Sequence, residues 1–297
     1  MPANMQLLDR LRCTLLACLP HHAVSRLVFR LTRIRTPAHV PVTRRFIRAY
    51  GVNMSEAEHS DPAAYSHFNA FFTRALRADA RPQQGDPATL TSPVDGRVSR
   101  MDTIEGDRVI QAKGIDYSLQ TLLGGDAQLA GRFDGHGFTT LYLAPGDYHR
   151  IHMPLAGRLQ QMIYVPGRLY SVADWTVRAL PGVFTRNERV CCLFETASGP
   201  LGLVLVGAIN VAAIETAWAG LVTPPRARRV ARWHYQPATA PSLQRGEEMG
   251  RFNMGSTVIV LAPPGYEWTE TRSPGAPVRV GEALARPHAA EARERAA

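Results

Sequence analysis

The sequence contains little lysine and little cysteine, and both shortages limit what it can be. Lys113 is the one lysine among 34 basic residues, and the four cysteines are Cys13, Cys18, Cys191 and Cys192. Four cysteines in 297 residues, two of them adjacent, form neither a disulfide framework nor the CxxC spacing of a zinc site. We therefore expect free, buried thiols in a reducing compartment and no bound metal.

Long hydrophobic runs and several common motifs are also missing. The longest apolar stretch, 201–222, contains Asn210 and Glu215 and predicts two buried strands rather than a transmembrane helix. Asp9 and Arg10 interrupt the apolar residues at the N-terminus before a secretory signal can form. The patterns GxxxxGK[ST], GxGxxG and GxSxG do not occur. We expect a cytoplasmic chain, either soluble or lying on a membrane surface.

Acidic residues are scarce in the first fifty positions, where the positive charge is concentrated. Residues 1–50 hold nine arginines and one acid, Asp9, so they carry 9 − 1 = +8 of the formal net charge of +9. The remainder of the chain is nearly neutral, at 9 − 8 = +1. This distribution disfavours a uniformly basic nucleic-acid binder and predicts a neutral body with a basic arm.

The arm, residues 1–50, shows helical periodicity. Apolar residues recur at helical spacing over 8–19, 24–31 and 46–50, with arginines on the other faces, and Pro37 and Pro41 interrupt the pattern. These segments are either ordinary surface helices or helices that lie on a membrane. Three basic amphipathic helices in series favour an anionic membrane surface as the partner.

Residues 51–89 predict a helix and a linker. A capping-box pattern begins at Ser55. Asp61 and Pro62 can begin a helix whose aromatic face runs over 65–76. The polar, proline-broken stretch 77–89 is typical of a linker.

The body, residues 90–285, is predicted to be rich in β-structure. Short apolar runs alternate with turn residues, and helical periods are nearly absent apart from a turn at 118–123. The predicted strands are 97–101, 108–112, 139–144, 158–165, 190–195, 201–206 and 256–261. The fold class is α+β, a β-rich barrel or sandwich preceded by short amphipathic helices, and the tail 286–297 is predicted to be loose.

Three short clusters in the body could carry chemistry, and each has an ordinary structural alternative. Asp95-Gly96 is typical of a hairpin turn. His149 and His152 precede Pro154 in a loop, and could form half a metal site or an exposed histidine pair. The third cluster, 252–259, contains a Gly-Ser-Thr turn leading into an apolar strand.

Taken together, the clusters supply the parts of a nucleophilic site. Asp95 is a candidate orienting carboxylate, His152 a candidate base and Ser256 a candidate hydroxyl nucleophile. The chain order Asp, His, Ser is compatible with a triad. Residue types alone go no further, because any chain of this size contains all three.

Seven motifs in a fixed order identify a resemblance to the bacterial phosphatidylserine decarboxylase proenzymes. The motifs are FNAFFTRAL at 68–76, QAKG at 111–114, YHRIHMP at 148–154, IYVPG at 163–167, RNERV at 186–190, TAWAG at 216–220 and GRFNMGSTVI at 250–259. The resemblance spans roughly residues 61–260. Val94 and Met254 stand where Ala and Leu are expected, and neither change removes a reactive group.

The resemblance implies an enzyme that processes its own chain between Gly255 and Ser256. His152, oriented by Asp95, would take the proton of the Ser256 hydroxyl as that oxygen attacks the Gly255 carbonyl. Elimination would then release a large chain, 1–255, from a small chain, 256–297, and convert Ser256 to a covalent pyruvoyl group. The glycine would suit a strained backbone and leave its carbonyl unshielded.

The resemblance also implies the external reaction and its setting. The pyruvoyl group would form a Schiff base with phosphatidylserine and release CO2 and phosphatidylethanolamine. His149 is the candidate proton donor to the product, and His152 is the second candidate. The enzyme would lie on the cytoplasmic face of the cell membrane, peripherally, and the two-chain unit could assemble as a homo-oligomer.

Two other function classes fit the same residues. A serine hydrolase would use Asp95, His152 and Ser256 on an external ester and leave the chain uncleaved. A basic adaptor without enzymatic activity would bind nucleic acid or membrane in a salt-dependent way. The neutral body argues against nucleic acid as the partner.

Overall fold

A large antiparallel sheet forms the centre of the molecule. A computed structural model describes residues 19–112, 114–209, 213–223 and 229–288. The strand order in this sheet is β12-β7-β8-β9-β15-β5-β2-β17, and β13 pairs with β7. The strands are β2 (Gly96–Thr103), β5 (Gly137–Tyr142), β7 (Gly157–Val165), β8 (Arg189–Thr196), β9 (Gly199–Val206), β12 (Ala231–His234), β13 (Ser242–Leu243), β15 (Thr257–Leu261) and β17 (Pro277–Val278).

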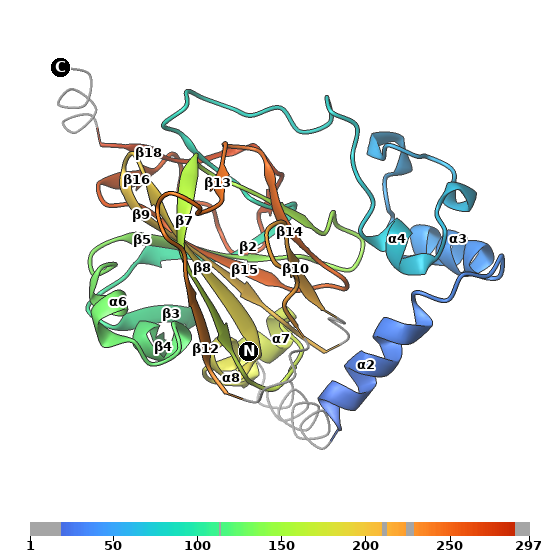
Figure 1. Ribbon diagram of the computed structural model, residues 1–297, viewed down its shortest axis with the longest axis horizontal. Helices are drawn as coiled ribbons and strands as arrows, with labels where there is room; N and C mark the ends of the chain where they lie inside the picture. The colour runs from blue at the N-terminus through green and yellow to red at the C-terminus, as the bar shows by residue number, and fades with distance from the viewer. Residues whose placement is uncertain (1–18, 113, 210–212, 224–228, 289–297) are drawn as a thin grey trace.

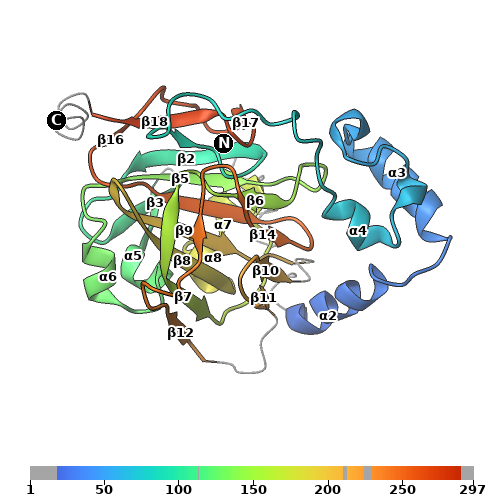
Figure 2. The ribbon, with the colours of Figure 1, turned by 45° about the horizontal axis from the view of Figure 1, so that its top comes forward.

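Two smaller sheets accompany the large one. One has the order β11-β10-β14-β6, from β6 (Arg150–His152), β10 (Ile214–Thr216), β11 (Gly220–Leu221) and β14 (Glu248–Phe252). The other has the order β1-β18-β16, from β1 (Leu90–Thr91), β16 (Tyr266–Trp268) and β18 (Ala283–Pro287). Together the sheets make a sandwich-like body (Figure 2).

Short helices and one hairpin form a further layer beside the large sheet. The hairpin joins β3 (Arg108–Ala112) to β4 (Ile115–Ser118). The helices are α5 (Leu119–Leu122), α6 (Ala127–Gly131), α7 (Asp174–Ala179) and α8 (Val183–Arg186). Buried Arg189 joins this layer to the sheet, because its guanidinium donates to the carbonyls of Thr121, Leu122, Thr185 and Asn187.

The N-terminal helices lie together on one side of the body, beside β10 and β14 (Figures 1 and 2). They are α2 (His21–Leu31), α3 (His39–Tyr50) and α4 (Phe68–Phe72), with 3-10 turns η1 (Met54–Glu56) and η2 (Pro62–Ala64). We call α2, α3, η1, η2 and α4 the helical module. Val52, Tyr65, Phe71 and Phe72 form its own small core, separate from the main core of the body.

The β-rich body of the sandwich form matches the expected fold class, and each strand predicted from an apolar run is present. Continuous apolar runs become strands buried on both faces, as in β15 between β5 and β9. Cys191 and Cys192 on β8 are free and buried, whereas Cys13 and Cys18 lie outside the described residues. None of the helices in the described ranges is long and apolar enough to cross a membrane.

The helical segments differ in detail from the expectation. The first predicted helix, 8–19, lies almost wholly outside the described residues. Pro41 does not interrupt α3 but lies in its first turn, where a missing N–H costs no helical hydrogen bond. Asn53, not Ser55, caps η1. Asp61 caps η2 as predicted, but the helix ends at Ala64, and the aromatic residues meet through a second helix, α4.

Candidate active site

Ser256 stands immediately before β15, a central strand of the large sheet. The strand is fixed on both sides, since Thr257 lies opposite Tyr142 on β5 and Val206 on β9. The carbonyl oxygen of Ser256 accepts a hydrogen bond of 2.9 Å from the Leu143 amide. The residue is fully buried, and its hydroxyl has no hydrogen-bond partner among the described residues. A buried hydroxyl without a hydrogen-bond partner lowers the stability of the fold.

Gly255 brings the backbone at the predicted cleavage bond against a histidine. A Cβ atom added to Gly255 would lie 3.6 Å from His149 Nε2 and 3.4 Å from the Leu143 carbonyl oxygen. Both are ordinary contact distances, and Gly255 is not among the glycines with positive φ. The expected backbone strain at Gly255 is therefore absent, and a small side chain would fit. What the glycine provides is an unshielded carbonyl.

His149 is held rigidly in its buried position. Its backbone carbonyl accepts from the Phe252 amide at 3.0 Å, which extends the β6–β14 pairing towards the cleavage bond. The Phe72 ring from α4 packs on the imidazole with the centroids 4.2 Å apart. Nδ1 lies 2.8 Å from the Asp147 carbonyl oxygen, which can only accept, so Nδ1 carries the hydrogen and Nε2 has a bare lone pair.

Burial keeps this imidazole neutral. Desolvation lowers the pKa of His149 to about 3, with a smaller contribution from the nearby Arg74 charge. Nε2, like the Ser256 hydroxyl, is buried without a hydrogen-bond partner. Among the described residues, the unpartnered nitrogen thus lies against Gly255, and the unpartnered hydroxyl belongs to the next residue in the chain.

His152 occupies a different environment, three residues further along the chain. Nδ1 lies 2.7 Å from the Gly246 carbonyl oxygen and therefore carries its hydrogen, so Nε2 accepts from the Tyr148 hydroxyl at 2.9 Å. Desolvation lowers the pKa of His152, and the same effect raises the pKa of Tyr148. Both ring nitrogens of His152 are thus already engaged.

Asp95 is also engaged elsewhere in this structure. Its carboxylate accepts from Arg81 Nε at 2.9 Å and from the Val280 amide at 2.9 Å. The hairpin alternative is not realised, because β1 and β2 belong to different sheets. Gly96 is needed for another reason: a Cβ there would overlap the Tyr142 carbonyl oxygen on the neighbouring strand.

The structure therefore joins some of the predicted site residues directly and others only by proximity. His149 lies against the backbone of Gly255, the residue that precedes Ser256 in the chain. In the described part of the chain, Asp95 and His152 share no hydrogen bond with each other or with Ser256, although the Asp95 charge raises the pKa of His152. In the described ranges, no group of three or more His, Cys, Asp or Glu side chains could hold a metal ion.

The sequence alone does not single out several residues that contact the site. Phe72 packs on His149, Tyr148 bonds His152, and Arg81 pairs with Asp95. Arg74 beside them is 5% exposed. Phe72, Arg74 and Tyr148 do lie within the motifs FNAFFTRAL and YHRIHMP, so the motif boundaries were the available signal.

Ser256 is thus a buried serine at the start of a central strand, and the bare imidazole nitrogen of His149 lies against the glycine before it. Comparison with known proteins points to one family. The family model for phosphatidylserine decarboxylase matches residues 68–286, and a second model, described as PSD, matches residues 11–51. The chain belongs to the phosphatidylserine decarboxylase family.

Relatives with the name phosphatidylserine decarboxylase proenzyme match along nearly their whole length. The protein of Alkalilimnicola ehrlichii is 54% identical over 255 residues, 86% of this chain and 88% of its own length. That of Bordetella petrii is 54% identical over 273 residues, 91% and 95% of the two chains. That of Azotobacter vinelandii is 51% identical over 270 residues, 90% and 94%.

The buried histidines predict a stability that falls in mild acid. The pKa of His149 is lower in the folded chain than the value of about 6.5 in the unfolded chain, so the unfolded state binds more protons as the pH falls below about 6.5. We expect His149→Gln, made in a Ser256→Ala background, to reduce the loss of unfolding free energy between pH 6.5 and pH 5. The slope should fall by up to about 1.4 kcal/mol per pH unit.

Urea unfolding at several pH values measures this slope. His59→Gln in the same background is the matched control, because it removes a solvent-exposed imidazole. Equal slopes for the His149 and His59 variants would contradict the neutral, desolvated state of His149.

Proposed function

We propose that this chain is a phosphatidylserine decarboxylase that makes its own reactive carbonyl by cleaving the Gly255–Ser256 bond, and that it converts phosphatidylserine to phosphatidylethanolamine. The observation that carries the proposal is the fully buried, unpartnered Ser256 hydroxyl beside the Gly255 backbone. The word proenzyme in the names of the relatives agrees with a processing step.

The cleavage chemistry uses only groups of the chain and one water. Ser256 Oγ loses its proton to a base and attacks the Gly255 carbonyl carbon, and the C–N bond breaks as the C–O ester bond forms. Loss of the Ser256 α-hydrogen then expels the Gly255 carboxylate and leaves a dehydroalanine. Tautomerisation and hydrolysis by water release ammonia and leave a pyruvoyl group at the new N-terminus, residue 256.

Asp95 and His152 are the proposed relay for this step, carried over from the family resemblance. For His152 to take the Ser256 proton, its Nε2 must exchange the Tyr148 hydroxyl for the Ser256 hydroxyl. Its Nδ1–H already faces the Gly246 carbonyl, which leaves Nε2 as the basic nitrogen. The negative charge of Asp95 would stabilise the imidazolium that forms.

His149 is the proposed proton carrier of the decarboxylation. The pyruvoyl group supplies a ketone that withdraws electrons from the carbon losing CO2. The bare Nε2 of His149 can accept a proton from the substrate ammonium and return it to that carbon once CO2 has left. This assignment agrees with the position of Nε2 against Gly255.

The hydrolase alternative has less support. Ser256 is 0% exposed and Phe72 of the helical module covers His149, so the hydroxyl of the uncleaved chain is not open to solvent. The Gly255–Ser256 bond, in contrast, is already adjacent to the hydroxyl. The site thus favours an internal reaction first.

The helical module supports peripheral attachment to an anionic membrane. Helix α2 turns polar residues inward: His21 and Ser25 are buried, and the Leu169 amide donates to His21 Nδ1. Its apolar Leu27 and Leu31 point outward, 57% and 55% exposed, and Ile34 follows at 51%. Exposed arginines flank them, at 26, 30, 35, 44, 45 and 48. We propose that this face meets the cytoplasmic leaflet.

Ser256→Ala should leave the chain whole while the wild-type protein separates into chains 1–255 and 256–297. Because the serine hydroxyl has no hydrogen-bond partner, its removal should not lower the melting temperature. Intact mass spectrometry and a denaturing gel check both the break and the altered residue 256. Ser242→Ala, on the exposed part of β13, is the control and should cleave normally. An active, uncleaved wild-type chain would refute the proposed function.

The two histidines should fail at different steps. We expect His152→Ala to block cleavage, and His149→Ala to cleave and then release CO2 from phosphatidylserine at least about 100-fold more slowly, as for loss of a general acid–base. Gel analysis measures the first step and CO2 release the second. The reverse pattern would move the base of self-cleavage to His149.

Replacing Leu27, Leu31 and Ile34 together with serine should weaken binding to vesicles rich in anionic lipid. Each side chain that enters the lipid contributes up to roughly 1.5 kcal/mol, so we expect a loss of at least about ten-fold. Co-sedimentation with vesicles measures it. Leu221→Ser, 50% exposed on the body, is the control and should bind as the wild type does. Unchanged sedimentation of the triple variant would exclude this face as the contact.

A further inference from the structure

Asn253, two residues before the proposed cleavage bond, is the point where the helical module meets the active-site segment. It is 1% exposed, and its backbone amide donates to the Ala213 carbonyl at 2.9 Å, beside β10. Its backbone carbonyl accepts from Asn69 Nδ2 of α4 at 2.8 Å. The Asn69 amide in turn donates to the Thr32 carbonyl at the end of α2 at 2.9 Å.

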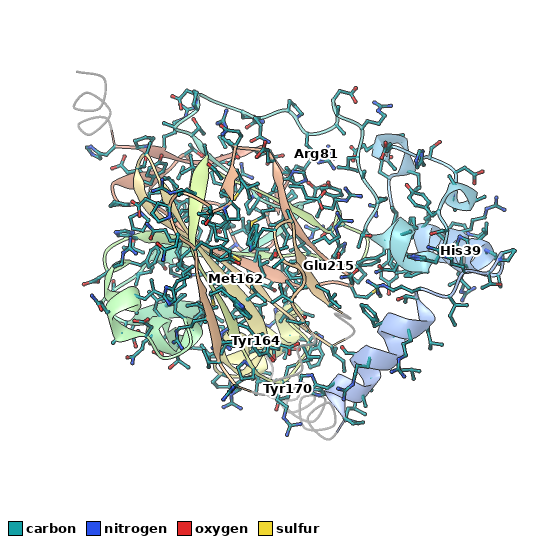
Figure 3. All side chains as sticks on the ribbon, in the orientation of Figure 1. His39, Arg81, Met162, Tyr164, Tyr170 and Glu215 are labelled. Carbon is teal, nitrogen blue, oxygen red and sulfur yellow. The ribbon has the colours of Figure 1, made fainter. Side chains whose placement is uncertain are left out.

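Both polar groups of the Asn253 side chain have hydrogen-bond partners. Its Oδ1 accepts from Arg33 Nη2 at 2.6 Å, and its Nδ2 donates to Glu215 Oε1 at 2.9 Å and to the Ala213 carbonyl at 3.2 Å. A cation thus faces the carbonyl of the amide, and a carboxylate faces its NH2 group. Glu215 lies at the edge of the body that faces the helices (Figure 3).

Arg33 is itself held in position by α2. Its guanidinium carbon lies 3.6 Å from the centroid of the Phe29 ring, and Nη1 donates to the Phe29 carbonyl at 3.3 Å. The same Nη2 that bonds Asn253 also lies 3.6 Å from Glu215 Oε1. The side chain is therefore aimed at Asn253 rather than at solvent, unlike the exposed Arg26 and Arg30 of the preceding helix, α2.

The helical module also contacts the residue that follows Asn253. Met254 packs against the module core that contains Phe72, and Phe72 covers His149. The module therefore fixes the chain before the cleavage bond and the imidazole that faces it.

From these contacts we propose that Arg33 is a positioning residue for maturation: through Asn253 it holds the segment before Gly255 so that Ser256 Oγ and the Gly255 carbonyl are aligned for self-cleavage. The contact is named here the Arg33–Asn253–Glu215 latch. The proposal rests on the proposed self-cleavage at Gly255–Ser256. It makes the basic arm part of the processing machinery and not only a membrane attachment.

The test follows cleavage of the full-length chain in time. Protein made by cell-free synthesis with labelled methionine is chased, and conversion to the 1–255 chain is read on a denaturing gel. We expect Arg33→Gln to slow cleavage about ten-fold, equivalent to about 1.4 kcal/mol in the activation free energy. Arg158→Gln removes the same charge from an exposed position on β7, outside the latch and the helical module, and should stay within about two-fold of wild type.

A double-mutant cycle separates positioning from general destabilisation. Asn253→Ala should slow cleavage at least as much as Arg33→Gln, and adding Arg33→Gln to Asn253→Ala should cause no further slowing, because both remove one contact. Independent effects on folding would instead multiply. Near-ultraviolet circular dichroism of each variant in the Ser256→Ala background reports whether it folds, and Arg33→Lys replaces Arg33→Gln if the latter does not.

The outcomes are distinct. A wild-type chain that never cleaves would refute the proposed function itself. A wild-type chain that cleaves while both Arg33 variants cleave within two-fold of it, or a double variant whose slowing is the product of the two singles, would refute the latch and leave the proposed function standing.

Discussion

The pairing of β15 between β5 and β9 is the constraint on which the site depends. Because this strand is hydrogen-bonded on both sides and fully buried, the residue before it cannot shift without breaking the large sheet. Ser256 is that residue, and the Leu143 amide fixes its carbonyl in addition. The reactive hydroxyl therefore takes its position from the most rigid part of the body, while the residues before it, 253–255, lie outside any strand and are held by side chains of the helical module.

Two buried polar atoms near the Gly255–Ser256 bond lack hydrogen-bond partners among the described residues. Most buried polar groups in proteins are hydrogen-bonded, yet Ser256 Oγ and His149 Nε2 are not. The stability lost there is balanced by well-bonded surroundings, in which the other nitrogen of His149, both nitrogens of His152 and the carboxylate of Asp95 are all engaged. The proposed nucleophile and the imidazole of His149 are thus buried among hydrogen-bonded neighbours.

The sequence was most informative where periodicity and burial coincide. Apolar runs predicted the strands of the large sheet, and ordered motifs identified the family and the Gly255–Ser256 bond. The sequence was least informative about which distant residues contact one another in the fold. Asp95-Gly96 looks like a hairpin turn from local chemistry alone, but Gly96 is there because β5 approaches so closely. The histidine spacing cannot tell which of His149 and His152 lies against Gly255, since that depends on a loop entering β6 and on Phe72 from a distant helix.

The position of the proposed cut within the sheet has a consequence for the mature protein. The chain from 256 onward contributes β15 to the middle of the large sheet, β17 to its edge, and β16 and β18 to a second sheet. Once severed, this segment would be held only by non-covalent pairing, yet it could not leave without opening the core. Unfolding would then release two separate polypeptides, so refolding would become a second-order process that depends on protein concentration. The stability of the cleaved enzyme would then be set by its rate of unfolding and not by a reversible folding equilibrium.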